Sequence, residues 1–228
     1  MSPSPSAAEV AAMTDHTLLA PEASDQDVEA LCREAVELGV CAACVSAARV
    51  PAAARALDGS SVRLAAVVGF PSGAHLAAVK ADEAARALAD GADELDMVID
   101  LAYAAVGDWA MVGEEIASVR AAAPAPVVLK VIIESAVLSE DQIDAACLAA
   151  VQAGADFVKT STGFHPAGGA SEAAVARMAA AVGSAGLGVK ASGGIRTAAQ
   201  ALAMIDAGAT RLGMSKTAQI LKELRADR

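Results

Sequence analysis

The run VVLKVII at residues 127–133 indicates the fold most clearly, because it is almost wholly apolar and has the length of one strand. The run LAAVVGF at 64–70 has the same character. Apolar runs without an alternating polar face are typical of parallel strands that are buried on both faces. The sequence therefore predicts a parallel sheet that is covered by helices.

Segments of this kind recur along the chain. Eight are expected to be strands, at 13–18, 41–46, 64–69, 94–99, 127–133, 157–161, 188–191 and 211–214. The segments between them carry apolar residues at helical spacing, and several begin with a capping residue, such as Ser24 with Asp27 or Ser139 with Gln142. Helices are expected at 25–38, 77–90, 109–121, 140–153, 172–178, 198–207 and 217–225.

Eight alternating strand and helix units in 228 residues predict an α/β fold, a TIM (β/α)8 barrel. A doubly wound sheet is the alternative. No Pro- or Ser-rich linker divides the chain, so we expect a flexible N-terminal tail over 1–12 and a single barrel domain over 13–228.

The composition narrows the possible functions. Hydrophobic residues make up 55% of the chain and charged residues 20%, which excludes a disordered protein. The net charge of -11 disfavours nucleic acid as a partner, and an anionic substrate would need a local positive pocket. The first ten residues lack an export signal and no apolar run could span a membrane. We expect a cytoplasmic protein.

Cysteine and histidine give no sign of redox or metal chemistry. Cys41 and Cys44 form a C-x-x-C pattern, but residues three apart on a strand face opposite sides of the sheet. We therefore expect reduced thiols rather than a disulfide. The three histidines share no ligand spacing, so no metal site is predicted. The G-x-G-x-x-A pattern at 186–191 precedes a strand, whereas a dinucleotide-binding loop must follow one.

Three of the six lysines lie inside expected strands: Lys130, Lys159 and Lys190. Lysine is almost never buried without a partner, and three copies facing one barrel interior favour a catalytic function. Desolvation and like charge both lower the pKa of a lysine, and a neutral amine can attack a carbonyl carbon to form a Schiff base. Asp96 and Asp15, also among apolar neighbours, are candidates for pairing with lysine or for relaying protons.

A phosphate site is expected where barrels commonly bind phosphate, in the loops after strands seven and eight. Glycine permits close approach of the backbone there, and basic side chains add positive charge. The candidates after the sixth, seventh and eighth strands are Gly163, Gly168, Gly169, Gly193, Gly194, Arg196, Gly213, Ser215 and Lys216.

At these positions the chain resembles the deoxyribose-phosphate aldolases, a family of class I aldolases with a TIM barrel. The resemblance runs from Asp15 to about Ser215. The segments that carry it are DHTLL at 15–19, VVGFPSGA at 67–74, DGADELDMVI at 90–99, LKVIIE at 129–134, GADFVKTSTGF at 154–164, VKASGGIRT at 189–197 and RLGMS at 211–215.

The resemblance implies a role for each matching residue. Lys159 would form the Schiff base, Lys190 would depress its pKa and assist proton transfer, and Asp96 would act with a water as general acid and base. Asp15, Lys130 and Thr160 would lie near the substrate. Backbone groups around Gly163, Gly193, Gly194 and Ser215 would hold the phosphate, with Arg196 and Gly213 beside them.

The chain also departs from the family pattern. Ala20 stands where many relatives have Lys, Ser46 where many have Asn, and Lys216 where Ser is common. The C-terminal tyrosine of some relatives is lacking, because the chain ends LKELRADR.

The resemblance implies reversible cleavage of 2-deoxy-D-ribose 5-phosphate to D-glyceraldehyde 3-phosphate and acetaldehyde. No metal or organic cofactor is expected, and the family suggests a homo-oligomer. Three alternatives remain open: another Schiff-base sugar-phosphate aldolase, a phosphate-binding barrel isomerase whose lysines only hold the anion, and a non-catalytic sugar-phosphate binding protein.

Overall fold

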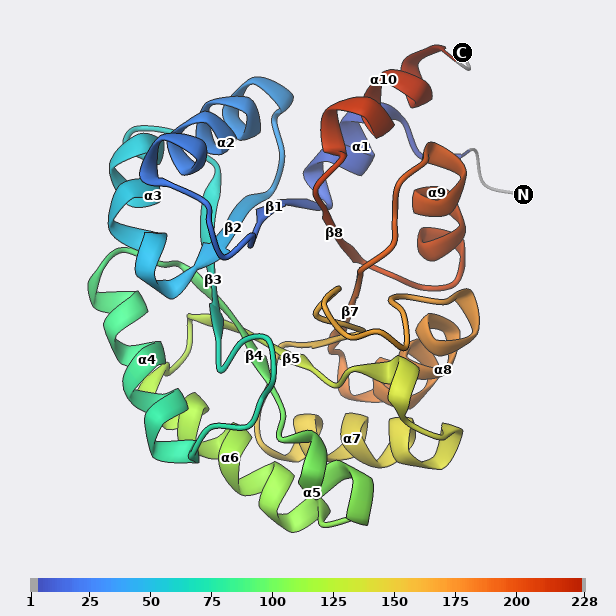
Figure 1. Ribbon diagram of the computed structural model, residues 1–228. Coiled ribbons are helices and arrows are strands. Elements are labelled where there is room, and N and C mark those ends of the chain that lie inside the picture. Colours follow the sequence, from blue (N-terminus) through green and yellow to red (C-terminus); the bar gives the residue numbers. More distant parts are fainter. Residues whose placement is uncertain (1–3, 227–228) are drawn as a thin grey trace.

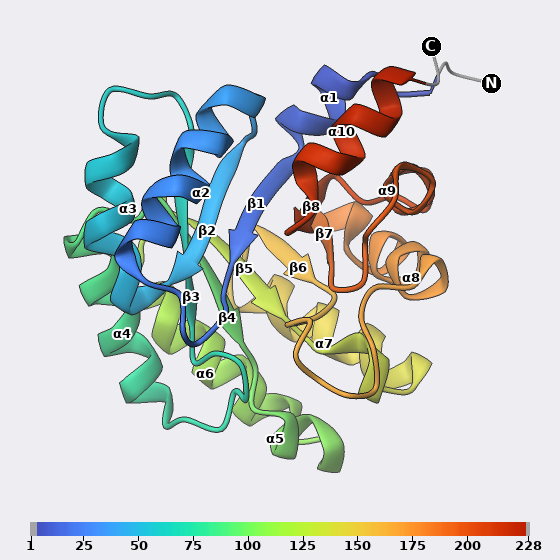
Figure 2. The ribbon, with the colours of Figure 1, turned by 45° about the horizontal axis from the view of Figure 1, so that its top comes forward.

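The computed structural model, which describes residues 4–226, is a closed barrel of eight parallel strands inside a ring of helices (Figure 1). The strands pair in chain order, and β8 closes the barrel on β1 (Figure 2). They are β1 Thr14–Leu18, β2 Ala42–Ser46, β3 Arg63–Val68, β4 Glu94–Val98, β5 Val128–Ile132, β6 Phe157–Lys159, β7 Gly188–Ser192 and β8 Arg211–Met214. The predicted TIM barrel is confirmed, and the doubly wound alternative is wrong.

Eight longer helices of the described chain surround the strands, and seven of them lie close to the expected positions. They are α2 Asp25–Leu38, α3 Val50–Leu57, α4 Ala77–Ala89, α6 Trp109–Ala122, α7 Glu140–Gln152, α8 Glu172–Val182, α9 Ala198–Asp206 and α10 Thr217–Ala226. The side-chain caps expected at Ser24 and Ser139 form, and Ser171 and Thr197 cap α8 and α9 in the same way. The sequence pattern did not predict α3 or the short α5, Leu101–Val106. Within residues 4–226, no helix is both long and apolar enough to cross a bilayer.

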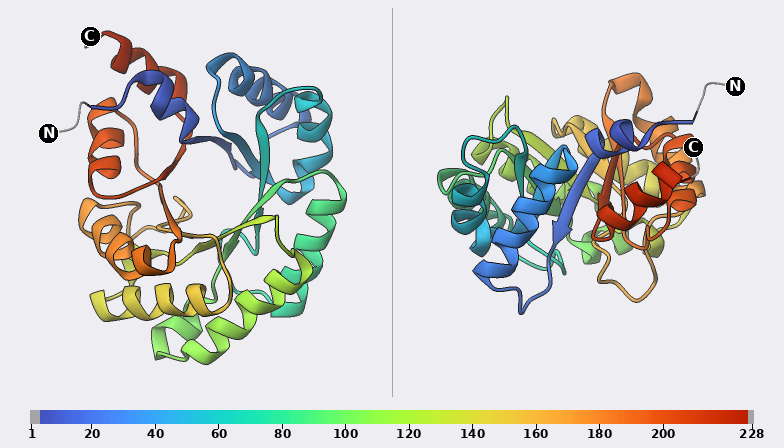
Figure 3. Two further views of the ribbon diagram at one scale, coloured as in Figure 1. Left: turned by 180° about the vertical axis from the view of Figure 1, so that it is seen from behind. Right: turned by 90° about the horizontal axis from the view of Figure 1, so that it is seen from above.

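The expectation of a flexible tail over 1–12 is wrong from Ala7 onward, and residues 1–3 lie outside the described part. Residues Ala7–Ala12 form the helix α1, which a capping box between Ser6 and Glu9 starts. Val10 and Ala11 are buried, and α1 packs against α10 (Figure 3). The cap and the apolar face outweigh the Ser- and Pro-rich composition that suggested a tail.

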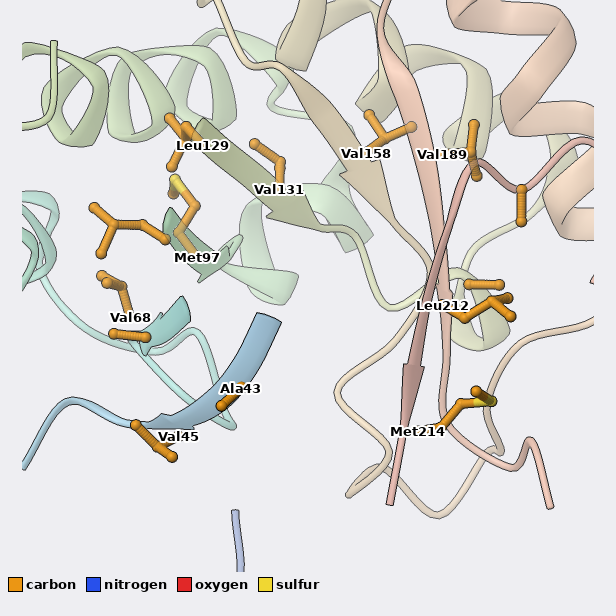
Figure 4. Close-up of a cluster of buried hydrophobic side chains, with 14 of the residues drawn as sticks. Ala43, Val45, Val68, Met97, Leu129, Val131, Val158, Val189, Leu212 and Met214 are labelled. Atoms are coloured by element: carbon orange, nitrogen blue, oxygen red, sulfur yellow. The ribbon is translucent and has the colours of Figure 1, made fainter. Parts of the chain in front are cut away.

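Alternate strand residues face opposite sides of the barrel wall. Those in Figure 4, such as Leu129 and Val131 on β5, belong to the large apolar cluster that joins strands to helices. The residue between them, Lys130, faces the interior, where its ammonium group lies 2.7 Å from a carboxylate oxygen of Asp96 on β4. The period of two along a strand therefore separates an apolar outer layer from a charged interior.

Small residues make room for the interior charges. A Cβ atom added to Gly213 on β8 would lie 3.2 Å from the Cε atom of Lys190 and 2.9 Å from the Cβ of Ser192. On the opposite side, Ala42, Cys44, Ala65 and Val67 form a separate small apolar cluster inside the barrel. The cysteines among the described residues are free, as expected.

A buried ion pair outside the barrel fixes the ends of β3 and β4. Lys80 on α4 is fully buried, and its ammonium group contacts Glu115 on α6 at 2.5 Å and donates to the carbonyl of Val98 at 2.8 Å. The other oxygen of Glu115 accepts from the backbone of Asp100 at 2.6 Å. The pair thus holds both helices against the strand end that follows Asp96.

We predict that Lys80→Met lowers the free energy of unfolding by about 3–5 kcal/mol, because it leaves the Glu115 carboxylate buried without its cation. Urea unfolding followed by circular dichroism measures the change. Arg86→Met is the matched control on the same helix: Arg86 pairs with Asp82 at the surface, so its loss should change stability very little. Equal effects of the two substitutions would contradict the structural role of the buried pair.

Candidate active site

Six side chains in the barrel interior form a closed ring of alternating charge. Asp96 contacts Lys190, Lys190 contacts Asp15, and Asp15 contacts Arg211. Arg211 contacts Glu94, Glu94 contacts Lys130, and Lys130 returns to Asp96. The six residues come from five strands, and each side chain is at most 10% exposed.

Lys159 lies beside this ring and is attached to it at one point. Its Nζ atom is 2.7 Å from Oδ2 of Asp96, the same oxygen that Lys190 contacts at 2.6 Å. Lys159 and Lys190 are register partners on β6 and β7, so both amines reach the same carboxylate from adjacent strands. Asp96 is therefore shared by three lysines, since Lys130 contacts its other oxygen at 2.7 Å.

A cavity of about 610 Å³ opens at the C-terminal ends of the strands, where barrel active sites are found. Of the seven charged residues just described, only Lys159 lines it. The wall also includes Thr162, Gly163 and Phe164 after β6. Loops after β1, β7 and β8, with the end of β8, complete the lining through Glu22, Gly193, Gly194, Arg196, Gly213, Ser215 and Lys216. A molecule in the cavity can thus reach the Lys159 amine, and the ring lies beneath it.

The surroundings of Lys159 favour its neutral form. Burial has the largest effect and lowers its pKa, the Asp96 carboxylate opposes this, and the Lys190 ammonium lowers the pKa again. The net result is a pKa below the ordinary lysine value. Desolvation and like charge, the two causes expected from the sequence, thus both lower the pKa of Lys159, and desolvation is the larger.

The other lysines of the interior remain charged. Burial disfavours the ammonium of Lys190, but Asp15 and Asp96 outweigh it and raise its pKa. Burial likewise disfavours the ammonium of Lys130, and Asp96 leads the groups that raise its pKa. The pKa of the Asp96 carboxyl lies well below its usual value, because the three lysines outweigh the penalty of burial. The one interior lysine with a lowered pKa therefore lies between a fixed ammonium and a fixed carboxylate.

The loops after β6, β7 and β8 line the cavity with unpaired backbone N–H groups and basic side chains. The backbone N–H groups of Gly163, Gly193, Gly194 and Ser215 have no acceptor within residues 4–226. Two exposed basic side chains, Arg196 and Lys216, line the same wall and make no ion pair in the described chain. Unpaired N–H groups together with positive charge are typical of phosphate sites. This local positive region is what an anionic substrate would need in a protein whose net charge is negative.

Close backbone packing explains two of the predicted glycines. A Cβ atom on Gly193 would lie 3.2 Å from the Cα of Gly163 and 3.1 Å from the Cα of Gly169. Both Gly163 and Gly193 have a positive φ, 83° and 84°. Glycine at these positions lets the loops after β6 and β7 touch, which brings their free N–H groups into one wall of the cavity.

Three residues expected to bind substrate do not line the cavity. The hydroxyl of Thr160 donates to the carbonyl of Ser192 and accepts from its N–H, both at 3.0 Å, and so joins β6 to β7. Asp15 and Lys130 are fully buried members of the ring. Contact of these three with substrate therefore remains a hypothesis, whereas their contacts with the catalytic candidates are direct.

Sequence reasoning gave no role to three residues that complete the site. Glu94 and Arg211 close the ring, and each lies two positions before an interior-facing residue of its strand, Asp96 or Gly213. That period of two was the available signal. Glu134, at 1% exposure, accepts from the hydroxyl and N–H of Thr162 at 2.6 and 3.2 Å, which orders the loop before Gly163.

Within residues 4–226, no group of three or more His, Cys, Asp or Glu side chains is arranged so that it could hold a metal ion.

The chain is similar to known proteins over nearly its whole length. The family model described as DeoC/LacD family aldolase matches residues 9–220. A deoxyribose-phosphate aldolase from Kocuria rhizophila is 61% identical over 217 residues, which cover 95% of this chain and 97% of that protein.

Two solved structures show the same architecture. A candidate deoxyribose-phosphate aldolase from Coccidioides immitis is 40% identical with a TM-score of 0.94, over 98% of this chain and 88% of that chain. The tetrameric deoxyribose phosphate aldolase from Aeropyrum pernix is 33% identical with a TM-score of 0.91, over 98% and 94% of the two chains. The barrel, its lysine-bearing interior and these similarities lead to one assignment: the chain belongs to the DeoC/LacD family of aldolases.

Proposed function

We propose that this aldolase cleaves 2-deoxy-D-ribose 5-phosphate reversibly to D-glyceraldehyde 3-phosphate and acetaldehyde, through a Schiff base on Lys159. One observation carries the proposal: within the charged interior, Lys159 alone lines the cavity, and its pKa is lowered. The anion site after β6, β7 and β8 would hold the 5-phosphate, so the sugar would extend from there to the amine.

The reaction begins when the neutral amine of Lys159 attacks the aldehyde carbon C1 to give a carbinolamine. Loss of water then yields an iminium ion on the same nitrogen. Lys190 and Asp96 lie beside this nitrogen and can donate and accept hydrogen bonds at the departing hydroxyl group. The fixed ammonium of Lys190 also disfavours protonation of the free amine.

Cleavage follows when the C3 hydroxyl loses its proton and the C2–C3 bond breaks. The bonding electrons pass to the iminium, which leaves an enamine, and glyceraldehyde 3-phosphate departs. Protonation of the enamine at C2 and hydrolysis of the resulting imine release acetaldehyde and restore the amine. We assign the proton transfers to Asp96, acting through a water, together with Lys190.

The proposed substrate is a phosphorylated metabolite, which supports a cytoplasmic location. The similar aldolase from Aeropyrum pernix is tetrameric, which supports a homo-oligomer here. Sedimentation or light scattering of the full chain would measure its assembly directly.

Borohydride reduction in the presence of acetaldehyde should inactivate the enzyme and leave an N-ethyl group on Lys159, because reduction fixes the imine as a secondary amine. Peptide mass mapping identifies the modified lysine. The Lys159→Met variant should give no adduct at the active site. An adduct on Lys190 or Lys130 would show that the nucleophile is assigned wrongly, and the absence of any imine would favour a barrel isomerase or a binding protein.

Lys190→Met should lose most activity near pH 7, and the acid limb of its kcat/KM profile should move to higher pH. Its removal leaves Asp15 and Asp96 with one cation fewer, so the pKa of Lys159 rises, and the neutral fraction falls about tenfold for each unit. Higher assay pH should then recover only the part lost through the pKa.

Lys222→Met is the matched control, because Lys222 is an exposed lysine on α10. Circular dichroism shows whether both variants keep the barrel. Near-normal activity of Lys190→Met with an unshifted profile would limit Lys190 to a structural role.

A further inference from the structure

We propose that Glu94 and Arg211 are positioning residues of the reaction, which close the ring of alternating charge and so leave no unpaired carboxylate to hold an ammonium group on Lys159. This inference rests on the function proposed above. It assigns a role in the chemistry to two residues that touch neither the cavity nor Lys159.

Each carboxylate of the ring has at least two ring cations as partners, and Asp15 also lies 3.8 Å from Lys130 across the ring. Asp15 contacts Lys190 and, at 2.6 Å, Arg211. Glu94 contacts Lys130 at 2.7 Å and Arg211 at 2.5 Å. Asp96 contacts Lys130 and Lys190 within 2.7 Å, so all three carboxylates are paired before Lys159 is considered.

The ring is neutral when its three cations and three carboxylates are all ionised. A proton on Lys159 would add an uncompensated positive charge to a site that is closed to water on the ring side, and burial makes that charge costly. Loss of Arg211 would leave the ring with an excess carboxylate, and loss of the Glu94 charge would leave it with an excess cation. Arg211 therefore lowers the pKa of Lys159, and the Glu94 carboxylate raises it.

The other groups that face Lys159 do not supply this balance. Cys44 on β2 lies near the amine, but burial raises the pKa of its thiol, so the thiol stays neutral in the working range. Glu22, Arg196 and Lys216 lie on the cavity side and are exposed to solvent, which screens them.

On the side of the ring away from Lys159, two further titratable groups lie close to Glu94 and Arg211. Arg63 is 3.6 Å from Glu94, but its side chain is 56% exposed and its charge is screened. Burial raises the pKa of the Cys41 thiol, next to Arg211, so that it also contributes no charge. The opposing charges that matter to Lys159 are therefore those of the ring.

The test is the pH profile of kcat/KM for Glu94→Gln, Arg211→Met and the charge-matched double variant. Arg211→Met should move the acid limb to higher pH by about one unit, and Glu94→Gln should move it to lower pH. The double variant keeps two carboxylates and two ammonium groups in the interior, so its charge is balanced and its acid limb should return toward the wild-type position. Arg211→Lys keeps the charge and should keep the limb.

Glu94→Gln changes the side-chain shape least, so it tests the inference even if Arg211→Met does not fold. Two results would overturn the inference: activity that falls in the single variants with an unshifted acid limb, or shifts of the same sign. Borohydride trapping with acetaldehyde separates the two proposals. Trapping on Lys159 in the wild type, with unshifted variants, defeats only the ring inference, whereas no trapping in the wild type defeats the Schiff-base function as well.

Discussion

The contact on which the charged interior depends is the sharing of one carboxylate, Asp96, by Lys130, Lys159 and Lys190. The carboxylate fixes three amines in one place, yet it cannot neutralise all of them. Lys130 and Lys190 each have a second carboxylate partner in the ring, Glu94 and Asp15 respectively, whereas Asp96 is the one ring carboxylate that Lys159 contacts. The lysine with the fewest anions is the one that faces the cavity, so the amine with the lowered pKa lies where a carbonyl compound can reach it.

The barrel makes this arrangement possible, because every second residue of each strand points into the same small volume. Side chains from strands far apart in sequence, such as Asp15 and Lys190, become direct partners there. Glycine and alanine on other strands leave space for the long lysine side chains. The buried pair of Lys80 and Glu115 holds the outer helices at the ends of β3 and β4. Apolar packing outside and charge pairing inside thus support the same strand positions.

The barrel and most of its helices could be predicted from the sequence, because apolar strand runs and helix caps are local signals. The lysines were visible as charges inside apolar runs, and the glycines after β6, β7 and β8 indicated the loops that line the cavity. The ring was missed, because Glu94 and Arg211 begin their strands, where a charge ordinarily reaches solvent, and only their period of two with Asp96 and Gly213 indicated that they face the interior. Thr160 has a backbone partner that the sequence did not indicate, since its hydroxyl donates to the carbonyl of Ser192, and the substrate contact that its motif suggested stays a prediction. The helix α1 was missed because its packing partner, α10, lies at the other end of the chain.

The central claim is that Lys159 loses its proton more readily than its neighbours Lys130 and Lys190, and NMR titration of lysine labelled at the side-chain nitrogen or Cε tests it most directly. The Lys159 signal is assigned by its absence from Lys159→Met. In the substrate-free protein it should titrate below the ordinary lysine value of 10.5, while the signals of Lys130 and Lys190 stay protonated beyond that pH. Titration of Lys159 at or above 10.5 would contradict the account, because burial and the Lys190 ammonium would then not favour the nucleophilic form of its amine.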